Sequence, residues 1–301
     1  MPELPEVETI VRDLCRRRVP GCRIVDVVLG WPGVVEAAGR NQFLRIVPGR
    51  RILSIVRRAK YLVFRMDNEM YLLAHLRMSG RIYLEPESGC HAATRLSLRL
   101  EDGRWLDFVD PRKFGRWMLV GNPAEVLGRL GPEPLSAVFT EAWLGEQLRL
   151  HRRQLKPLLL DQTFLAGLGN IYVDEALWAA GIHPCRCAAD LSDREVQSLH
   201  KAIGRVLRQG IRNRGTSLGN GRPNFKSPDG RQGRNRSRLH VFRRTGQPCP
   251  RCGKSIERMV VGQRGTHLCP ACQIRPSLLP CASPRFPRPA RRGPLRNARS
   301  A

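Results

Sequence analysis

The sequence predicts a multidomain α+β protein: an N-terminal β-sandwich with a flanking N-terminal helix, a helical domain, and a small C-terminal module built on four cysteines. Three observations indicate this. Short β-rich runs fill residues 22–120, helical periodicity dominates from about residue 122, and paired cysteines occupy 249–272. The domain boundaries that we expect are 1–121, 122–240 and 241–273, followed by a disordered basic tail at 274–301.

The first element is an amphipathic helix over residues 5–19, PEVETIVRDLCRRRV. Pro5 suits a first helical turn, and acidic Glu6 and Glu8 suit the positive end of the helix dipole. Its apolar residues recur at helical spacing and form one stripe, namely Val7, Ile10, Val11 and Leu14. The stripe predicts that this helix packs against a core.

The β-region contains the runs CRIVDVVL, RILSIVRRAKYLVFRM, MYLLAHLRMSGRIYL and ATRLSLRLEDGRWLDFVD. The pair DN at 67–68 and the triplet EDG at 101–103 mark turns between strands. Many short strands without intervening helices indicate a sandwich or a barrel.

The helical region contains EVLGRLG, EAWLGEQLRLHRRQLKPLLLD, NIYVDEALWAAG and DREVQSLHKAIGRVLRQGI. The stretch SLGNGRPNFKSPDGRQGRNRSR follows and has little apolar content, so we expect a mobile loop there. The last stretch, from residue 273, holds seven Arg, six Pro and no acid, which is typical of disorder.

The charge balance points to a polyanionic partner. The chain has 52 Lys+Arg against 26 Asp+Glu, a formal net charge of +26, and phosphates neutralised by such residues release counterions. An acidic membrane surface is the competing partner, but no long apolar run or Lys-rich amphipathic helix is present. We expect no signal peptide and a cytoplasmic, nucleoid-associated protein, in which cysteines are thiols or metal ligands.

The cysteine pattern predicts one structural Zn²⁺. Cys249-x2-Cys252 and Cys269-x2-Cys272 are separated by sixteen residues, which is the spacing of a four-Cys zinc site. The segments SIERMVV and THLCP can pair as a hairpin between the two cysteine pairs, and the metal supplies the folding energy of such a small module. The other six cysteines have no such pattern and are interpreted as buried or idle thiols: Cys15, Cys22, Cys90, Cys185, Cys187 and Cys281.

The N-terminus offers chemistry. Without Met1 the chain begins with Pro2, a secondary amine whose pKa, like that of other α-amino groups, is roughly 8. Such an amine can attack a sugar carbon and form an iminium ion, and the neighbouring carboxylate of Glu3 can move protons. From these two residues alone, an ordinary start to a capped helix is the better interpretation.

The rest of the chain changes this interpretation. PELPEVETIVRDL resembles the start of the formamidopyrimidine-DNA glycosylase family, which repairs oxidised purines in bacteria. RRAKYLVF, HLRMSG, DPRKFG, LLLDQTFLAGLGNIYVDEAL, GIRNRGTS and the CPRC…CPACQ module resemble further motifs of that family, in the same order, from residue 2 to about residue 273. The resemblance implies a bifunctional DNA glycosylase and abasic-site lyase for 8-oxoguanine and formamidopyrimidines.

By the same resemblance, Pro2 forms the Schiff base, Glu3 is the general acid, and β- and δ-elimination follow. Lys60 and Arg264 assist through phosphate and proton positioning, although a snorkelling lysine and a solvated arginine are the plainer interpretations. Glu6 supports the site, and Glu175 orders the turn at Asn170.

The resemblance also implies contacts with duplex DNA. Met78, Arg112 and Phe114 enter the gap left by the flipped nucleotide, unless the Met and the Phe are simply core residues. Asn170 begins a helix whose first amides face a phosphate, as part of a helix–two-turns–helix element. His75 is a further expected DNA-binding residue. Arg152 and Lys156, on the helix that we expect before the Asn170 turn, either contact phosphate or are solvated charges.

Several positions depart from the family pattern. Ala59 stands where Gly is usual, and His91 lies two residues from Ala93, where a DNA-contacting His is common. The lesion-recognition loop, about 216–236, has Asn235-Arg236 in place of an expected Phe-Gln pair, so the sequence leaves lesion preference open.

Two other functions stay possible on this sequence. One is an oxidised-pyrimidine glycosylase of the endonuclease VIII type, although that branch typically starts PEGPE. The other is a zinc-ribbon DNA-binding protein without catalysis. We expect a monomer, because the DNA duplex rather than a second subunit completes the site.

Overall fold

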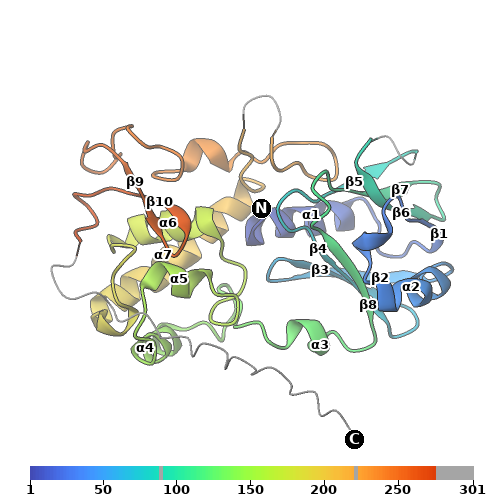
Figure 1. The fold of residues 1–301 in the computed structure, drawn as a ribbon, viewed down its shortest axis with the longest axis horizontal. Helices are drawn as coiled ribbons and strands as arrows, with labels where there is room; N and C mark the ends of the chain where they lie inside the picture. The colour runs from blue at the N-terminus through green and yellow to red at the C-terminus, as the bar shows by residue number, and fades with distance from the viewer. Residues whose placement is uncertain (88–90, 220–222, 276–301) are drawn as a thin grey trace, which may run out of the picture.

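The computed structural model describes residues 1–87, 91–219 and 223–275. Two four-stranded antiparallel sheets form the N-terminal sandwich, with strand orders β1-β6-β7-β5 and β2-β3-β4-β8 (Figure 1). Phe64, Phe108 and Trp117 are fully buried between the two sheets, and the Trp117 ring contacts the rings of both phenylalanines. The strands are β1 Ile24–Val28, β2 Ile52–Arg58, β3 Tyr61–Met66, β4 Tyr71–His75, β5 Arg81–Glu85, β6 Thr94–Leu100, β7 Trp105–Val109 and β8 Arg116–Val120.

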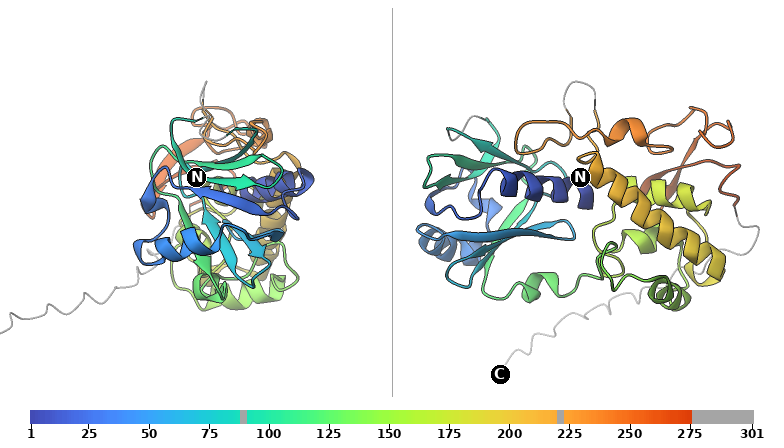
Figure 2. Two further views of the ribbon diagram at one scale, coloured as in Figure 1. Left: turned by 90° about the vertical axis from the view of Figure 1, so that its right-hand side faces the viewer. Right: turned by 180° about the vertical axis from the view of Figure 1, so that it is seen from behind.

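Helix α1, Leu4–Arg16, lies along the sandwich and packs against β2, β3 and α7, Asp193–Arg212 (Figure 2). The predicted apolar stripe is buried in the sandwich core, which confirms the amphipathic interpretation. The helix ends earlier than predicted, because Arg18 adopts a left-handed φ of 56° and turns the chain. A short helix α2, Arg40–Ile46, and two 3₁₀ turns, Pro32–Val34 and Ala37–Gly39, complete this part.

The helical part contains α3 Ala124–Leu127, α4 Glu141–Arg149, α5 Leu155–Leu160, α6 Asn170–Ala180 and α7, with 3₁₀ turns at Ala188–Asp190 and Asn235–Arg238. The prediction of one helical segment over 141–161 is wrong, since the helix is interrupted between the end of α4 and the start of α5. The backbone amides of Leu155 and Lys156 donate to Arg186 and Pro184 instead of extending α4. Among the described residues, no helix has both the length and the hydropathy to cross a membrane.

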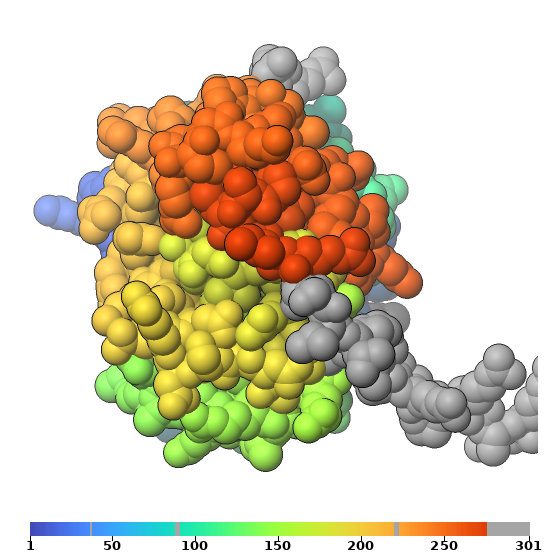
Figure 3. Space-filling model, turned by 90° about the vertical axis from the view of Figure 1, so that its left-hand side faces the viewer, coloured from blue at the N-terminus to red at the C-terminus, as the bar shows by residue number. Residues whose placement is uncertain are grey.

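The cysteine module contains the predicted hairpin, with β9 Glu257–Val261 paired antiparallel to β10 Arg264–Leu268. Its small core of Cys249, Cys269, Ile256 and Val241 packs on Trp178 of α6. Figure 3 shows this module, drawn orange to red, resting on the helical part.

The segment after α7, predicted to be a mobile loop, returns to the sandwich, and its described parts make packing contacts that its composition did not indicate. Phe225 is 1% exposed and joins the sandwich core. The guanidinium of Arg81 donates to the carbonyl of Pro223 at 2.6 Å. The backbone amide of Leu84 donates to the carbonyl of Pro228 at 3.3 Å. One aromatic residue therefore anchors a loop whose composition is otherwise polar. Residues 220–222, Cys90 and the tail from 276 lie outside the described residues.

Candidate active site

The carboxylate of Glu3 lies at the N-terminus of α6. It accepts hydrogen bonds from the backbone amides of Ile171 at 2.9 Å and Tyr172 at 3.3 Å. Glu3 is 3% exposed, and burial raises the pKa of its carboxyl while the charge of Lys60 and the two amides oppose the rise. Gly169 makes this approach possible, because a Cβ there would lie 2.3 Å from the Glu3 Cδ. The two amides expected to face a phosphate are therefore occupied by Glu3.

Glu6 lies beneath Glu3 and holds its backbone. The Glu3 amide donates to Glu6 Oε2 at 2.8 Å, and Glu6 Oε1 accepts from the amide of Thr216 at 2.6 Å and the hydroxyl of Tyr172 at 2.8 Å. Burial, reinforced by the nearby Glu3 charge, raises the pKa of Glu6 to about 7. Glu6 thus fixes the N-terminal residues to both α6 and the segment after α7.

Lys60 lies in the two-residue turn between β2 and β3, not within a strand as its apolar neighbours suggested. It is 5% exposed, and burial lowers the pKa of its amine to about 8 although Glu3 and Glu6 oppose the shift. The charge of Lys60 therefore acts together with those of the two carboxylates. Pro2, the residue before Glu3, is buried. The amine at the N-terminus of this structure is that of Met1, and burial lowers its pKa while the charges of Glu3 and Glu6 oppose that change.

An ion-pair cluster supports the Lys60 turn. Ala59 has a left-handed φ of 52°, which is unfavourable for a residue with a side chain. The carboxylate of Glu133 accepts the Ala59 amide hydrogen and pairs with Arg57 and with Arg58, the latter at 3.1 Å. The linker between the sandwich and the helical part therefore holds the turn that carries Lys60.

The zinc-module hairpin closes another side of the site. Arg264, exposed at the start of β10, adds its charge to the electrostatic environment of Lys60. Asn170 donates its side-chain amide to the carbonyl of Gly265 at 2.9 Å. Asn170 and Arg264 are thus brought together by the contact of α6 with β10, far apart as they are in sequence.

Lys156 corrects the prediction made for it. Its side chain is 0% exposed and donates to Asp174 at 2.6 Å and to Thr266 Oγ1 at 2.8 Å. It therefore joins α5 and α6 to β10 rather than meeting phosphate or solvent. Arg152 is exposed as expected, but it lies in the break between α4 and α5 rather than on a helix.

Glu175 also acts elsewhere than predicted. Its buried carboxylate accepts the backbone amides of His240, Val241 and Phe242 at 2.9–3.0 Å, and it contacts His240 Nδ1 at 3.0 Å. It therefore orders the start of the zinc module, not the turn at Asn170.

Two loops at one end of the sandwich carry the residues expected to enter the duplex. Met78 and Phe114 are 47% and 43% exposed, so the alternative that they are core residues is wrong. The guanidinium of Arg112 lies over the Phe114 ring, 4.7 Å from its centroid. The loops are joined by buried Asp110, which accepts from the Ser79 hydroxyl and from the amides of Arg112 and Gly115.

His75, at the end of β4, is neutral at working pH, because burial and the charges of Arg77 and Lys60 lower its pKa to about 3. Its Nδ1 accepts the Arg77 amide at 3.0 Å, so Nε2 carries the hydrogen. His91 stacks on Tyr83, with ring centroids 4.4 Å apart.

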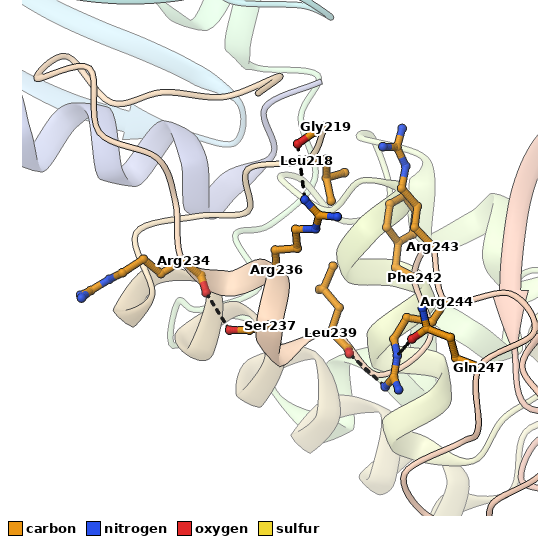
Figure 4. A pocket seen from close by; sticks show the side chains of 10 residues that line it. All are labelled: Leu218, Gly219, Arg234, Arg236, Ser237, Leu239, Phe242, Arg243, Arg244 and Gln247. Carbon is orange, nitrogen blue, oxygen red and sulfur yellow. Dashed lines mark hydrogen bonds between the residues drawn. The ribbon is translucent and has the colours of Figure 1, made fainter. Parts of the chain in front are cut away.

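A cavity of about 970 Å³ opens beside the loop after α7 (Figure 4). Its wall combines apolar Leu218, Leu239 and Phe242 with arginines, and Arg236 reaches toward the carbonyl of Gly219. Leu218, on this wall, lies two residues after Thr216, whose backbone amide donates to Glu6. The cavity therefore adjoins the N-terminal site.

The four cysteines fit one zinc ion. Their sulfur atoms all lie within 4.8 Å of one another, with 3.9 Å between Cys249 and Cys272 and 3.4 Å between Cys252 and Cys269. Tetrahedral Zn–S bonds of about 2.3 Å require sulfur separations near these values. The indole of Trp178 and backbone amides donate to the sulfurs, as they would to thiolates.

This arrangement defines a class of protein: a β-sandwich with a buried N-terminal site, a helical part that completes the site, and a zinc finger. Three family models match in that order. The formamidopyrimidine-DNA glycosylase N-terminal domain matches residues 1–117, its H2TH domain matches 130–220, and the zinc finger found in FPG and IleRS matches 246–274. The chain belongs to the formamidopyrimidine-DNA glycosylase family.

Similar proteins cover the same part of the chain. The formamidopyrimidine-DNA glycosylase of Protochlamydia amoebophila is 44% identical over 91% of this chain and 99% of the relative. The crystal structure of the MutM (Fpg) protein from Thermus thermophilus has a TM-score of 0.81 and 43% identity, covering 90% of this chain and 98% of that one. Two structures of Lactococcus lactis Fpg, one with abasic-site DNA and one of a point mutant with Fapy-dG DNA, each have a TM-score of 0.83 and 36% identity. Each match covers 91% of this chain and 100% of the Lactococcus lactis chain.

Sequence reasoning missed Asp110, Glu133, Tyr172 and Thr216 as supporting residues. Asp110 and Thr216 lie within motifs already noted, DPRKFG and GIRNRGTS, so their positions carried a signal. Glu133 carried none, because its partners are more than 70 residues away in the chain.

Proposed function

We propose that this protein is a bifunctional DNA glycosylase and abasic-site lyase that removes oxidised purines from duplex DNA. The observation that carries the proposal is that Pro2, Glu3 and Lys60 are all buried, with Glu3 held at the start of α6 and the charges of Glu3 and Lys60 acting on each other. Once Met1 is removed, the nitrogen of Pro2 is the amine of this site. A nucleophilic amine, a proton donor and a cation are the groups that iminium chemistry at a sugar carbon requires. The similar Lactococcus lactis proteins that bind abasic-site and Fapy-dG DNA support the substrate class.

The proposed reaction begins after Met1 is removed. The Pro2 nitrogen attacks C1′, the bond from C1′ to the base breaks, and the base leaves with the proton that the Pro2 nitrogen loses. Glu3 then donates a proton to O4′, which opens the sugar ring and leaves an iminium ion between the Pro2 nitrogen and C1′. A carboxyl whose pKa burial raises is suited to that role. The iminium ion then acidifies the C2′ hydrogen, whose loss expels the 3′ phosphate, and a second elimination expels the 5′ phosphate. Lys60 and Arg264 hold the phosphates during these steps.

In this proposal Met78, Arg112 and Phe114 fill the gap left by the flipped nucleotide. Arg112 offers donors to the orphaned cytosine and Phe114 wedges the stack. Asn170, neutral His75 and exposed Arg152 contact the DNA backbone, and the chain acts as a cytoplasmic monomer. The division proposed is 1–121 for catalysis, 122–240 for DNA binding and 241–273 for the zinc finger.

The test compares duplexes containing 8-oxoguanine opposite C with duplexes containing thymine glycol, using the full chain lacking Met1. The proposal expects excision of 8-oxoguanine and a one-nucleotide gap. Preferential excision of thymine glycol would favour the oxidised-pyrimidine alternative. Binding of both duplexes without strand cleavage would indicate a non-enzymatic DNA-binding protein.

A further inference from the structure

Asn235, in the arginine-rich segment after α7, is 2% exposed, although both of its sequence neighbours are exposed arginines. Its side chain is held on both sides. The Asn213 side-chain amide donates to Asn235 Oδ1 at 3.0 Å, and Asn235 Nδ2 donates to Thr216 Oγ1 at 3.1 Å. Its backbone amide donates to the carbonyl of Gly215 at 3.1 Å. A buried amide with its donor and acceptor both used holds its segment in one position.

The hydrogen bonds continue from Asn235 into the N-terminal site. Thr216 Oγ1 lies 3.0 Å from the Tyr172 hydroxyl, which donates to Glu6 Oε1 at 2.8 Å. Glu6 Oε2 accepts the backbone amide of Glu3 at 2.8 Å. Because the Tyr172 hydrogen goes to Glu6, Thr216 donates to Tyr172 and uses its lone pair for Asn235. The hydrogen bonds from Asn235 to Thr216, to Tyr172 and to Glu6 therefore all have their donors on the Asn235 side. In such a series each hydrogen bond strengthens the next.

We propose that Asn235 is a positioning residue for the reaction: through Thr216 and Tyr172 it ties the arginine-rich segment to Glu6 and so to the backbone of Glu3. The inference rests on the proposed function. Asn235 also orients its neighbour Arg236, whose side chain lines the cavity of Figure 4. One amide thereby links the cavity wall with the residues that begin the chemistry.

The link makes a prediction that distinguishes it from simple loop packing. A residue that only shapes the cavity for a flipped base matters when a base is present. A residue that positions Glu3 and the adjacent amine also matters on DNA whose base is already missing. The informative assay is therefore the single-turnover rate of borohydride trapping on preformed abasic-site DNA, with enzyme in excess.

Asn235→Ala removes the hydrogen bond that residue 235 donates to Thr216, so it should slow this trapping about tenfold. DNA affinity should change by less than about threefold. Asn235→Asp keeps the shape but cannot donate to Thr216, so it should slow trapping at least as much. Thr216→Val breaks the same chain at the next link. The double variant Asn235→Ala/Thr216→Val should be no slower than the slower single variant, because both changes remove one connection.

Asn224→Ala is the matched control. Asn224 holds the same segment through a 2.6 Å hydrogen bond from the Leu218 amide to its side chain, and no described bond joins it to Thr216 or Glu6. It should trap abasic-site DNA at the wild-type rate within about twofold. Thermal unfolding and zinc content are measured for every variant, so that only folded, zinc-containing proteins are compared.

Three outcomes decide the matter. Slow trapping by the Asn235 and Thr216 variants with a normal Asn224 variant supports the inference. Wild-type trapping by folded Asn235→Ala and Asn235→Asp, or equal slowing by Asn224→Ala, overturns it. Absence of any adduct with the wild-type chain lacking Met1 overturns the proposed function instead, so the two failures are distinguishable.

Discussion

Glu3 and Ile171 are joined by a 2.9 Å hydrogen bond from the Ile171 amide to the Glu3 carboxylate, which brings the chain's third residue to the start of α6. The bond explains how an N-terminus, usually a frayed part of a protein, becomes ordered enough for chemistry. It also means that the sandwich and the helical part build the site together. Changes on either side of the bond should affect catalysis.

Replacing Gly169 with Ala tests this contact. The new Cβ would lie 2.3 Å from the Glu3 Cδ, so the carboxylate must leave the α6 terminus. We expect 8-oxoguanine excision to fall by roughly 100-fold, the size typical of losing a positioned catalytic group. Gly39→Ala is the control, because a Cβ there meets nothing within 4 Å. Equal activity of the two variants would contradict the assigned role of Glu3.

The pH dependence of DNA binding tests Lys60. Since burial lowers the pKa of Lys60 to about 8, its amine carries a proton below that pH and loses it above. Affinity for a duplex with a stable abasic-site analogue should therefore weaken by about threefold to tenfold between pH 7 and pH 9. Lys60→Arg stays protonated and should lack this change. A wild-type affinity that is flat across the range would contradict a charged contact between Lys60 and phosphate.

Glu133→Ala should misplace the Lys60 turn by removing the acceptor of the Ala59 amide. We expect strand cleavage at abasic sites to slow by about tenfold. Because Ala59 has a φ of 52°, Ala59→Gly relieves the strain that Glu133 opposes and should restore part of the activity in the double variant. The comparison variant is Glu101→Ala, which removes an ion pair with Arg51 and a hydrogen bond from the Arg23 amide, with no described contact to the Lys60 turn. Failure of Ala59→Gly to restore any activity would count against this explanation.

Asp110→Ala should release both loops that carry Met78, Arg112 and Phe114. Excision from a duplex requires base flipping, so its rate should fall by about tenfold or more. Cleavage of single-stranded abasic DNA, which has no stack to open, should change much less. Equal losses on the two substrates would show that Asp110 acts through general folding.

Cys252→Ala removes one of four zinc ligands and should release the metal, since three thiolates cannot close the tetrahedral site. The hairpin that carries Arg264 and contacts Asn170 and Lys156 then loses its support. We expect zinc content near zero by metal analysis and DNA affinity lower by at least about tenfold. Cys187→Ala, outside the cluster, should retain both. Full affinity without zinc would contradict this role of the module.

The sequence predicted those features that depend on local pattern. The stripe of α1, the strands and the two cysteine pairs follow from residue periodicity and spacing. Long-range partners were not predictable: Lys156 looked like a surface cation, yet its partners Asp174 and Thr266 lie 18 and 110 residues away and bury it completely. Glu175 was misassigned for the same reason, since its partners at 240–242 lie in another module.

The segment after α7 was the largest departure from expectation. Its polar composition indicated mobility, but Phe225 inserts into the sandwich core and Asn235 is buried by hydrogen bonds. Single anchoring residues of this kind do not alter the average composition of a segment. The resemblance supplied candidate site residues but not their supporting contacts.

The most direct test of the central claim is to locate the covalent bond. The chain lacking Met1 is incubated with abasic-site duplex and borohydride, the adduct is digested, and the modified peptide is sequenced by mass spectrometry. We expect the sugar remnant on the Pro2 nitrogen, with no adduct in a chain whose terminus is acetylated. An adduct on Lys60, or none with the unblocked chain, would contradict catalysis by the N-terminal proline.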